Sequence, residues 1–209
     1  MVGTATIASH IFIVDENHAL CRGYSAILGD LGLSTTACIN CTTDCIHKLQ
    51  ALSNAEDGLV IVGPNPDERE VFQLFRWLHC ERPNIKTILI SRQASDRDFC
   101  LDVAANHVKA CLPHTARCED IAQAILDVLA GKLLFSSDVL EQAFQPIELS
   151  PRERDVLGLM AEGKTYMLIA EALSLSCKTV DNHRHKIFKK LNVTSKEAAV
   201  ARAYRRGLL

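Results

Sequence analysis

Short apolar runs alternate with amphipathic segments between residues 11 and 129. The runs have the length of buried strands, and between them apolar residues recur every three or four positions, as on one face of a helix. The predicted strands cover residues 11–14, 34–39, 59–62, 85–90 and 108–112. The predicted helices cover residues 18–31, 44–52, 68–80, 97–105 and 119–129. Continuous apolar strands separated by helices predict a five-stranded, parallel, doubly wound α/β sheet.

From residue 148 onward the pattern is that of helices alone. Ser150, Pro151 and Glu153 have the spacing of an N-cap, a proline at the first helical position and a capping-box glutamate. Gly163 ends this helix, and Thr165 can cap a second one. The expected buried stripe of the second helix is Leu168, Ile169, Ala172 and Leu173. A turn then leads to a third helix over 177–191, and a last helix is expected over 195–206.

The third helix has an outer side rich in charged and polar groups, once its apolar residues are placed inside. Those groups are Lys178, Asp181, Asn182, Arg184, His185, Lys186 and Lys189. Ammonium and guanidinium groups neutralise phosphates, while Asn, Asp and His can hydrogen-bond base edges in the major groove. A solvated charged face is the alternative, but it leaves the organised helical unit unexplained. The pattern favours a helix-turn-helix that binds double-stranded DNA.

The charge distribution agrees with this interpretation. Residues 148–209 carry 12 Lys and Arg against 7 Asp and Glu, whereas residues 1–147 carry 11 against 18. A chain of net charge −2 therefore joins an acidic N-terminal part to a basic C-terminal module.

The pieces LSPRERDVL, IAEALSLSCKTVDNH, KKLNV and RRGLL follow one another as in the LuxR-type (GerE-like) DNA-binding domain, which the segment closely resembles. The resemblance implies that Asp181, Asn182 and His185 read bases. It implies backbone contacts from Lys178, Thr179, Arg184 and Lys189. His183 matches a frequent histidine of the family, for which packing inside the domain and a DNA contact remain equally open. Dimers would pair through the last helix, with Ala198, Ala201 and Tyr204 as candidates, although the two alanines fit an ordinary core equally well.

One departure from that family lies at the start of the second helix. Tyr166, Met167 and Leu168 stand where Asn-Lys-Glu is frequent, so a usual phosphate-contacting lysine is missing. Lys164 or Tyr166 would have to supply that contact, and Thr165 between them is a further candidate for DNA binding. The same departure favours the alternative function, an antagonist that pairs with another regulator without reading DNA. The intact basic helix opposes it.

The N-terminal part resembles the receiver domain of NarL/FixJ-type response regulators. In that family two acids after strand one hold Mg²⁺, an Asp after strand three accepts the phosphoryl group, and a Ser or Thr and a Lys follow strands four and five. Asp15 and Glu16 match the acids, and Ser91 matches the hydroxyl. Gly63 and His114 stand where the phosphoacceptor and the lysine belong. Glycine has no nucleophile, so the resemblance implies a degenerate receiver that is not phosphorylated in the usual way.

Without a third carboxylate, Asp15 and Glu16 are expected to be solvated loop acids rather than a metal site. The signal would then reach this domain from a small ligand, a partner protein, a cysteine-based event or protein abundance. His114 is expected to be an ordinary polar residue at a strand end.

Nine cysteines are many for this length. Cys38, Cys41 and Cys45 form a C-x₂-C-x₃-C group with His47 nearby, a spacing able to bind Zn²⁺ or an iron–sulfur cluster. Cys45, in a first helical turn, could have a lowered pKa. Core filling is the more common use of free cysteine, and no second CxxC completes the group, so no metal or cofactor is predicted.

Several protein classes are disfavoured. No apolar run of about 18 residues predicts a membrane span, and no catalytic motif predicts an enzyme. The first residues lack a basic leader and suggest a strand rather than a signal peptide, so a cytoplasmic protein is expected. The resemblance to LuxR-type domains implies a homodimer. The expected organisation is a receiver-like domain over 1–130, a linker with a short helix over 131–147 and the DNA-binding domain over 148–209.

Overall fold

The computed structural model describes residues 10–53 and 56–209, and the chain divides into two compact units between Phe144 and Gln145. The segment expected to lack a signal peptide lies largely in residues 1–9, outside the described residues. Helix α6 (Ser137–Ala143) belongs to the N-terminal unit, because its Val139 and Ala143 are buried against α4. Most of the segment predicted as a linker is therefore packed structure.

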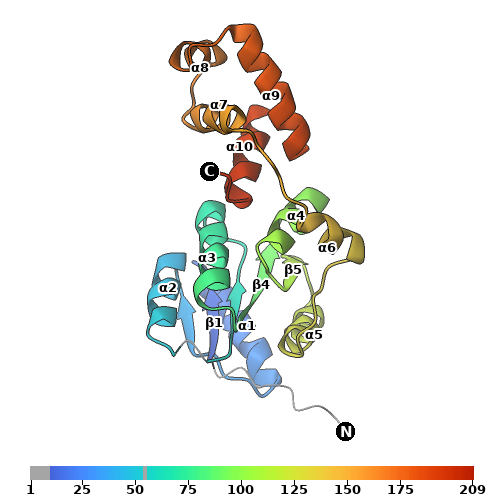
Figure 1. Ribbon diagram of the computed structural model, residues 1–209. Coiled ribbons are helices and arrows are strands. Elements are labelled where there is room, and N and C mark those ends of the chain that lie inside the picture. The colour runs from blue at the N-terminus through green and yellow to red at the C-terminus, as the bar shows by residue number, and fades with distance from the viewer. Residues whose placement is uncertain (1–9, 54–55) are drawn as a thin grey trace. The chain divides into compact units, whose positions relative to one another are not determined.

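The N-terminal unit has the predicted five-stranded parallel sheet, in the order β2-β1-β3-β4-β5 (Figure 1). Its strands are β1 (His10–Val14), β2 (Ala37–Ile39), β3 (Gly58–Val62), β4 (Ile85–Ser91) and β5 (Ala110–Pro113). The strand order reverses at β1, which lies between β2 and β3. Such a reversal opens a crevice at the carboxyl ends of the strands, where ligands of doubly wound sheets bind.

Helices cover both faces of this sheet. They are α1 (His18–Asp30), α2 (Thr42–Gln50), α3 (Glu68–Glu81), α4 (Arg97–Ala105) and α5 (Cys118–Leu129). Ile11 and Ile13 point toward a core shared with α1 and α5, whereas Phe12 and Val14 point toward a core shared with α2, α3 and α4. Because successive strand side chains point to opposite faces, a strand packed on both sides is apolar throughout, as the sequence pattern predicted.

Three predicted elements start two or three residues away from the expected position. Strand β2 begins at Ala37 rather than residue 34, β5 at Ala110 rather than residue 108, and α2 at Thr42 rather than residue 44. The Cys41 sulfur caps α2 by accepting a hydrogen bond from the Asp44 amide. The helix therefore begins directly after Cys41, two residues before the predicted start at Asp44.

The C-terminal unit is a four-helix domain with its own core, as predicted. It comprises α7 (Pro151–Ala161), α8 (Tyr166–Ala172), α9 (Cys177–Leu191) and α10 (Lys196–Arg205). The capping box of α7 is confirmed: the Ser150 hydroxyl accepts from the Glu153 amide at 3.3 Å, and Glu153 accepts from the Ser150 amide at 2.7 Å.

The predicted buried stripe of α8 was partly wrong. Ile169 and Ala170 are buried, while Leu168 is 45% exposed and Ala172 is also exposed. A helix of seven residues has room for one narrow buried face, and here that face runs through Ile169, Ala170 and Leu173. Among the described residues, no helix combines the length and the apolar character that a membrane span needs.

Candidate functional site

Helix α9 is fixed at both ends and along one side. The Ser176 hydroxyl caps its first turn by accepting from the Thr179 amide, and Asn192 ends it in a left-handed conformation. Val180, Ile187 and Leu191 are buried in the core of the C-terminal unit. The helix therefore presents its other side in one fixed orientation.

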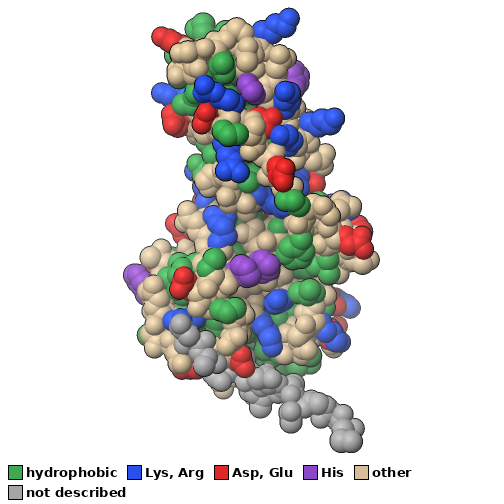
Figure 2. Space-filling view, viewed as in Figure 1, with side chains coloured by type: hydrophobic (Ala, Val, Ile, Leu, Met, Phe, Trp, Pro, Cys, Tyr) green, Lys and Arg blue, Asp and Glu red, His purple; other side chains and the backbone are tan. Residues whose placement is uncertain are grey.

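That other side carries a ridge of exposed polar groups, which we call the α9 ridge. It consists of Lys178, Asp181, Asn182, His185, Lys186 and Lys189. All six were predicted to face outward, and the structure places them so. Figure 2 shows Lys and Arg side chains gathered on the visible face of the C-terminal unit. Three ammonium groups on one helical side can neutralise phosphates, and amide and imidazole groups between them can meet base edges.

The carboxylate of Asp181 is already engaged within the helix. It accepts from Arg184 at 2.7 Å and lies 3.4 Å from the His185 Nε2 atom. Exposed pairs of this kind contribute little to stability. They place two of the side chains that the resemblance assigned to base reading, Asp181 and His185, next to each other on the ridge.

Arg184 was also predicted to face outward, but unlike the residues of the α9 ridge it is partly buried. Its guanidinium carbon lies 5.5 Å from the Tyr166 ring centroid and 5.6 Å from that of Phe188. Only 27% of its side chain is exposed. Arg184 thus ties α8 to α9 through cation–π contacts, and Tyr166, the residue that departs from the family pattern, is its partner.

The remaining residues predicted to contact DNA are either exposed at the start of α8 or half-buried in α9. Lys164 and Thr165 are exposed at the start of α8, where the Thr165 hydroxyl accepts from the Leu168 amide at 3.4 Å. The Thr179 hydroxyl is half-buried and hydrogen-bonded to Ser176 at 2.8 Å. His183 is also half-buried, with its Nδ1 atom enclosed and without a partner among the described residues. This placement favours the packing interpretation of His183 over a DNA contact.

An ion pair that the sequence did not reveal joins α7 to α9. The Lys190 ammonium donates to Glu153 at 2.7 Å, and the Glu153 side chain is only 4% exposed. Burial raises the pKa of Glu153, but the hydrogen bonds from Lys190 and from Ser150 outweigh it, so this pKa is lowered. The capping-box carboxylate therefore also holds the orientation of α9.

Helix α10 separates its small residues between two faces. Ala199 and Ala203 are buried in the core, whereas Ala198, Ala201 and Tyr204 are half-buried. The three residues predicted for dimerisation thus share a partly accessible face, and the core is made by other alanines of the same helix.

In the N-terminal unit, Asp15 is fully buried, so the expectation that it would be a solvated loop acid was wrong. One carboxylate oxygen accepts from the Asn17 amide at 2.6 Å and from the Asn65 side chain at 2.8 Å. The other oxygen is buried with no partner among the described residues. It lies 1.9 Å from where a Cβ atom on Gly63 would stand. Asp15 therefore fills the space that a side chain at residue 63 would need.

The surroundings of Asp15 are enclosed as well. The Cys21 thiol donates to the Asp15 carbonyl at 3.4 Å. Burial, followed by the negative charge of Asp15, raises the pKa of Tyr24 to about 12. Glu16, by contrast, is exposed, as predicted.

These residues do not fit Mg²⁺, the ion held by the family that the N-terminal part resembles. Asp15 has one oxygen committed to two donors, and Gly63 offers no carboxylate. Ser91 accepts from the Gln93 amide at 3.1 Å, and His114 is exposed, with its amide donating to the Ser91 carbonyl. The predicted positions do meet at the carboxyl edge of the sheet, but they provide neither a phosphoacceptor nor a fixed cation.

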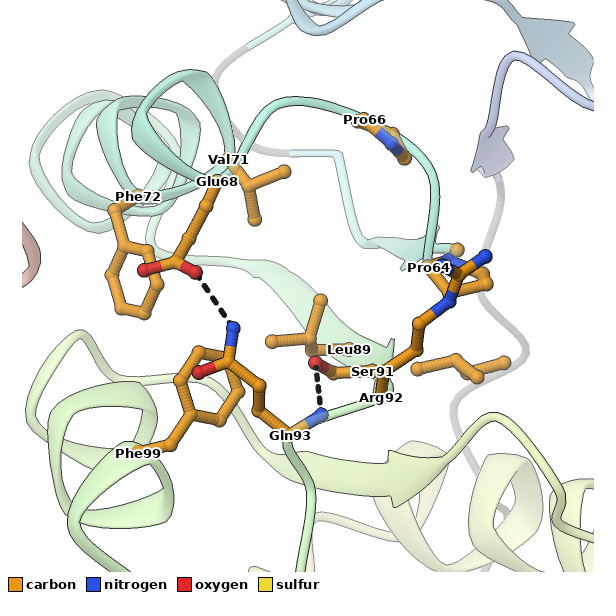
Figure 3. A pocket seen from close by; sticks show the side chains of 12 residues that line it. Pro64, Pro66, Glu68, Val71, Phe72, Leu89, Ser91, Arg92, Gln93 and Phe99 are labelled. Carbon is orange, nitrogen blue, oxygen red and sulfur yellow. Dashed lines mark hydrogen bonds between the residues drawn. The ribbon is translucent and has the colours of Figure 1, made fainter. Parts of the chain in front are cut away.

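A cavity of about 210 Å³ opens at the same edge, beside Gly63 and the ends of β3 and β4 (Figure 3). Its apolar wall is formed by Val71, Phe72, Leu89 and Phe99. Glu68 and Gln93, hydrogen-bonded at 2.8 Å, lie at its rim with Ser91 and Arg92. A mixed apolar and polar lining of this kind suits a small organic molecule better than a bare ion.

The predicted cysteine group does not come together as a metal site. Among the described residues no cluster of three or more His, Cys, Asp or Glu side chains could hold a metal ion. Cys38 is exposed beside Ser25, the Cys41 sulfur caps α2, and Cys45 is buried. Burial raises the pKa of Cys45 to about 12, so the expectation of a lowered pKa was also wrong.

Residues 148–203 match the family model described as bacterial regulatory proteins, luxR family. Among characterised proteins, the response regulator GacA of Pseudomonas aeruginosa is 26% identical over 95% of this chain and 97% of its own length. The chain carries a luxR-family domain and is homologous to bacterial response regulators. The transcriptional regulatory protein DesR of Bacillus subtilis is 34% identical over 48% of this chain and 51% of its own length.

Solved structures confirm the fold at the level of both domains. A complex of the response regulator RcsB with DNA has a TM-score of 0.67, with 20% identity over 92% of this chain and 96% of that one. RcsB of Salmonella enterica serovar Typhimurium, bound to a promoter, has a TM-score of 0.72 at 19% identity over 95% and 98%. The fold of this chain, a receiver-like sheet followed by a helical domain, is therefore shared with these structures.

Proposed function

We propose that this protein is a sequence-specific transcription regulator that binds double-stranded DNA as a homodimer, and that its N-terminal unit acts without phosphoryl transfer. The observation that carries the proposal is the α9 ridge, a fixed helix side with three free-standing lysines around Asn182 and His185. The homologues are response and transcriptional regulators rather than enzymes. A helix held in this way can enter the major groove with its polar side toward the bases.

In this proposal Asn182, His185 and Asp181 read bases, while Lys178, Lys186 and Lys189 contact phosphates. Lys164, Thr165 and Tyr166 lie at the start of α8, where a helix-turn-helix crosses the DNA backbone. Two RcsB dimers on two DNA molecules form one solved neighbour. A two-fold dimer of this chain through Ala198, Ala201 and Tyr204 would bind half-sites about one helical turn apart.

Phosphorylation independence is supported by the sheet edge. Gly63 has no carboxylate, and Asp15 is buried behind it with two donors on one oxygen. We expect that acetyl phosphate adds no phosphoryl group to the N-terminal unit and leaves DNA affinity unchanged. Intact-mass measurement after treatment tests this directly. A mass increase of one phosphoryl group on an N-terminal Asp would refute it.

The input to the N-terminal unit is proposed to be a small ligand in the cavity beside Gly63 or a partner protein at that edge. The cavity walls are apolar, and Arg92 at the rim offers a cation to a ligand carboxylate. Titration of small aromatic and aliphatic carboxylates, with Phe72→Leu as a variant that enlarges the cavity, tests the first option by the shift in melting temperature.

A second candidate function, an antagonist that pairs with another regulator, is favoured by one observation. Met167 is 70% exposed and Leu168 45% exposed on α8, in the segment that departs from the family pattern. Genome-wide DNA occupancy, followed by mobility shifts of purified protein on the occupied sites, separates the two. Specific shifts by the purified protein alone support the regulator. Occupancy that requires a second regulator, with no shift by this protein, supports the antagonist.

A further inference from the structure

Arg184 and His185 are neighbours in α9, and a hydrogen bond joins their side chains. The Arg184 Nη2 atom lies 3.0 Å from the His185 Nε2 atom. The same Nη2 atom lies 2.7 Å from a carboxylate oxygen of Asp181, three residues earlier in the helix. Arg184 therefore contacts two of the side chains that are proposed to read bases.

The guanidinium of Arg184 is supported from beside the α9 ridge. Its cation–π contacts reach Tyr166 in α8 and Phe188 in α9. Its side chain is 27% exposed, compared with 51% for Asp181 and 66% for His185. Cation–π contacts are stronger where the cation is partly removed from water. The aromatic rings therefore hold the arginine beside two side chains that are more exposed than it is.

The chemistry of the guanidinium determines which form of His185 this hydrogen bond requires. Arginine has five N–H donors and no acceptor, and it stays protonated in proteins. The His185 Nε2 atom must therefore accept the hydrogen bond, so it carries no hydrogen. A hydrogen on Nε2 would face an N–H of Arg184, while the Asp181 carboxylate that would accept it is farther away, at 3.4 Å. His185 is thus a neutral imidazole with its hydrogen on Nδ1.

A hydrogen on Nδ1 makes His185 a hydrogen-bond donor on the α9 ridge. In the major groove cytosine presents a donor, adenine an acceptor beside a donor, and thymine an acceptor beside a methyl group. Guanine presents two acceptors, N7 and O6, and no donor. A side chain that only donates, next to a guanidinium, therefore matches guanine better than the other three bases.

We infer that Arg184 is a positioning residue that holds His185 as the Nδ1–H tautomer, and that His185 in this form selects guanine at one position of each half-site. The inference rests on the proposed function, because it names the base that one residue of the α9 ridge reads. Arg184 does not touch the base in this arrangement. It acts by occupying Nε2, the acceptor atom that an amino group of adenine or cytosine would otherwise use.

The first measurement uses the full chain without DNA. Nitrogen–proton correlation spectra of the imidazoles at about pH 8, where histidine is neutral, show which ring nitrogen carries the hydrogen. His185→Gln identifies the signals of His185 among the eight histidines. We expect wild-type His185 to carry its hydrogen on Nδ1.

A substitution at Arg184 tests whether the arginine causes this tautomer. Arg184→Met keeps an unbranched side chain beside the two rings but offers no donor. We expect His185 in this variant to return to the Nε2–H form, which free neutral histidine favours. Arg152→Met removes an exposed arginine from α7 and is the matched control, in which His185 should keep the wild-type tautomer.

The second measurement uses DNA that carries an occupied site, with each G·C pair replaced in turn by A·T. We expect wild type to lose affinity roughly 3- to 10-fold at one guanine of each half-site, the effect of a single hydrogen bond. His185→Ala and Arg184→Met should both lose this preference. Arg152→Met should keep it.

The outcomes separate this inference from the proposed function. A hydrogen on Nε2 of wild-type His185 would overturn the inference and leave DNA binding intact. An Arg184→Met variant that keeps the tautomer or the full guanine preference would also overturn it, because Arg184 would then have only a structural role. The wild-type spectrum and the His185→Ala scan do not depend on the folding of that variant. Absence of DNA binding by wild type would overturn the proposed function, and with it the choice of guanine, whereas the tautomer is still measured on the free protein.

Discussion

Asp15 and Glu153 are both buried carboxylates, one in each unit, and their surroundings differ. Glu153 accepts from Lys190 and from the Ser150 amide, so its charge is balanced and its hydrogen bonds serve α7 and α9 together. Asp15 has donors on one oxygen only, and the other oxygen is enclosed against Gly63. The first carboxylate supports a surface that faces outward, whereas the second is enclosed at the edge of the sheet.

The same contrast holds for the surfaces themselves. The α9 ridge exposes three lysines and three other hydrogen-bonding side chains on one helix. The sheet edge offers a buried acid, a glycine, and an apolar cavity beside them. The comparison shows that the two units of one chain can differ in their polar surfaces: the ridge is exposed, whereas the acid at the sheet edge is enclosed.

The largest expected effect concerns the basic ridge. With about three phosphate contacts per subunit, a DNA-bound dimer should lose roughly 10³-fold in affinity between 50 and 200 mM salt. Lys186→Ala should weaken all sequences alike and lower the slope of log affinity against log salt by about one per subunit. Fluorescence anisotropy over a salt series measures both. Lys132→Ala, in the N-terminal unit, is the control. A DNA affinity that does not change with salt would contradict the proposal that the lysines of the α9 ridge contact phosphates.

The next effect concerns the sheet edge. Gly63→Asp forces a Cβ and a second carboxylate into the space occupied by Asp15, so we expect the N-terminal unit to lose about 3 kcal/mol of unfolding free energy. Trp77, the only tryptophan, lies in α3 of that unit, so its fluorescence reports this unfolding separately. Gly63→Asp combined with Asp15→Ala should recover most of the loss. A Gly63→Asp variant as stable as wild type would show that Asp15 moves freely.

A smaller effect should separate base reading from backbone contact. Asn182→Ala and His185→Ala should each reduce the preference for an occupied site over altered DNA by about 1–3 kcal/mol. Competition between the natural site and single base-pair variants measures this preference. Lys189→Ala should weaken both DNAs equally, and a loss of specificity in that variant would reverse the assigned roles.

The smallest effect concerns the ion pair between Lys190 and Glu153, which joins α9 to α7. Lys190→Met removes the partner of Glu153 and should cost the C-terminal unit about 1–2 kcal/mol at neutral pH, since Lys190 itself is partly exposed. The lowered pKa of Glu153 means that its stabilising effect is present above its ordinary pKa and is lost as the pH falls through the lowered value. Wild type should therefore approach the variant in acid. Denaturation of residues 145–209 followed by circular dichroism measures this, with Lys186→Met as control.

The local sequence pattern was sufficient to predict the role of a residue that interacts with residues close to it in the chain. The capping box at Ser150 and Glu153, the cap at Thr165 and the outward side of α9 were all predicted, because helix caps and helical faces depend on spacings of three or four residues. The parallel sheet was predicted for the same reason, since strands packed on both faces are apolar throughout.

Tertiary structure alone decided how distant side chains share space. Asn65 binds Asp15 across 50 residues, and Lys190 binds Glu153 across 37. The position of Asn65 just after β3 gave some indication that it would reach the sheet edge, whereas no spacing points from Lys190 to Glu153. Arg184 was predicted to contact phosphate, but its guanidinium lies near the rings of Tyr166 in α8 and Phe188 in α9.

The sequence by itself therefore determined the two domains, the luxR-family type of the second and the absence of a side chain at residue 63 of the first. Only the folded chain determined that Asp15 is buried in the space left at Gly63. The physical reason is that the burial of a side chain and its contacts depend on which helices and strands pack together. The sequence pattern shows the periodicity of each helix or strand, but not which other elements it packs against.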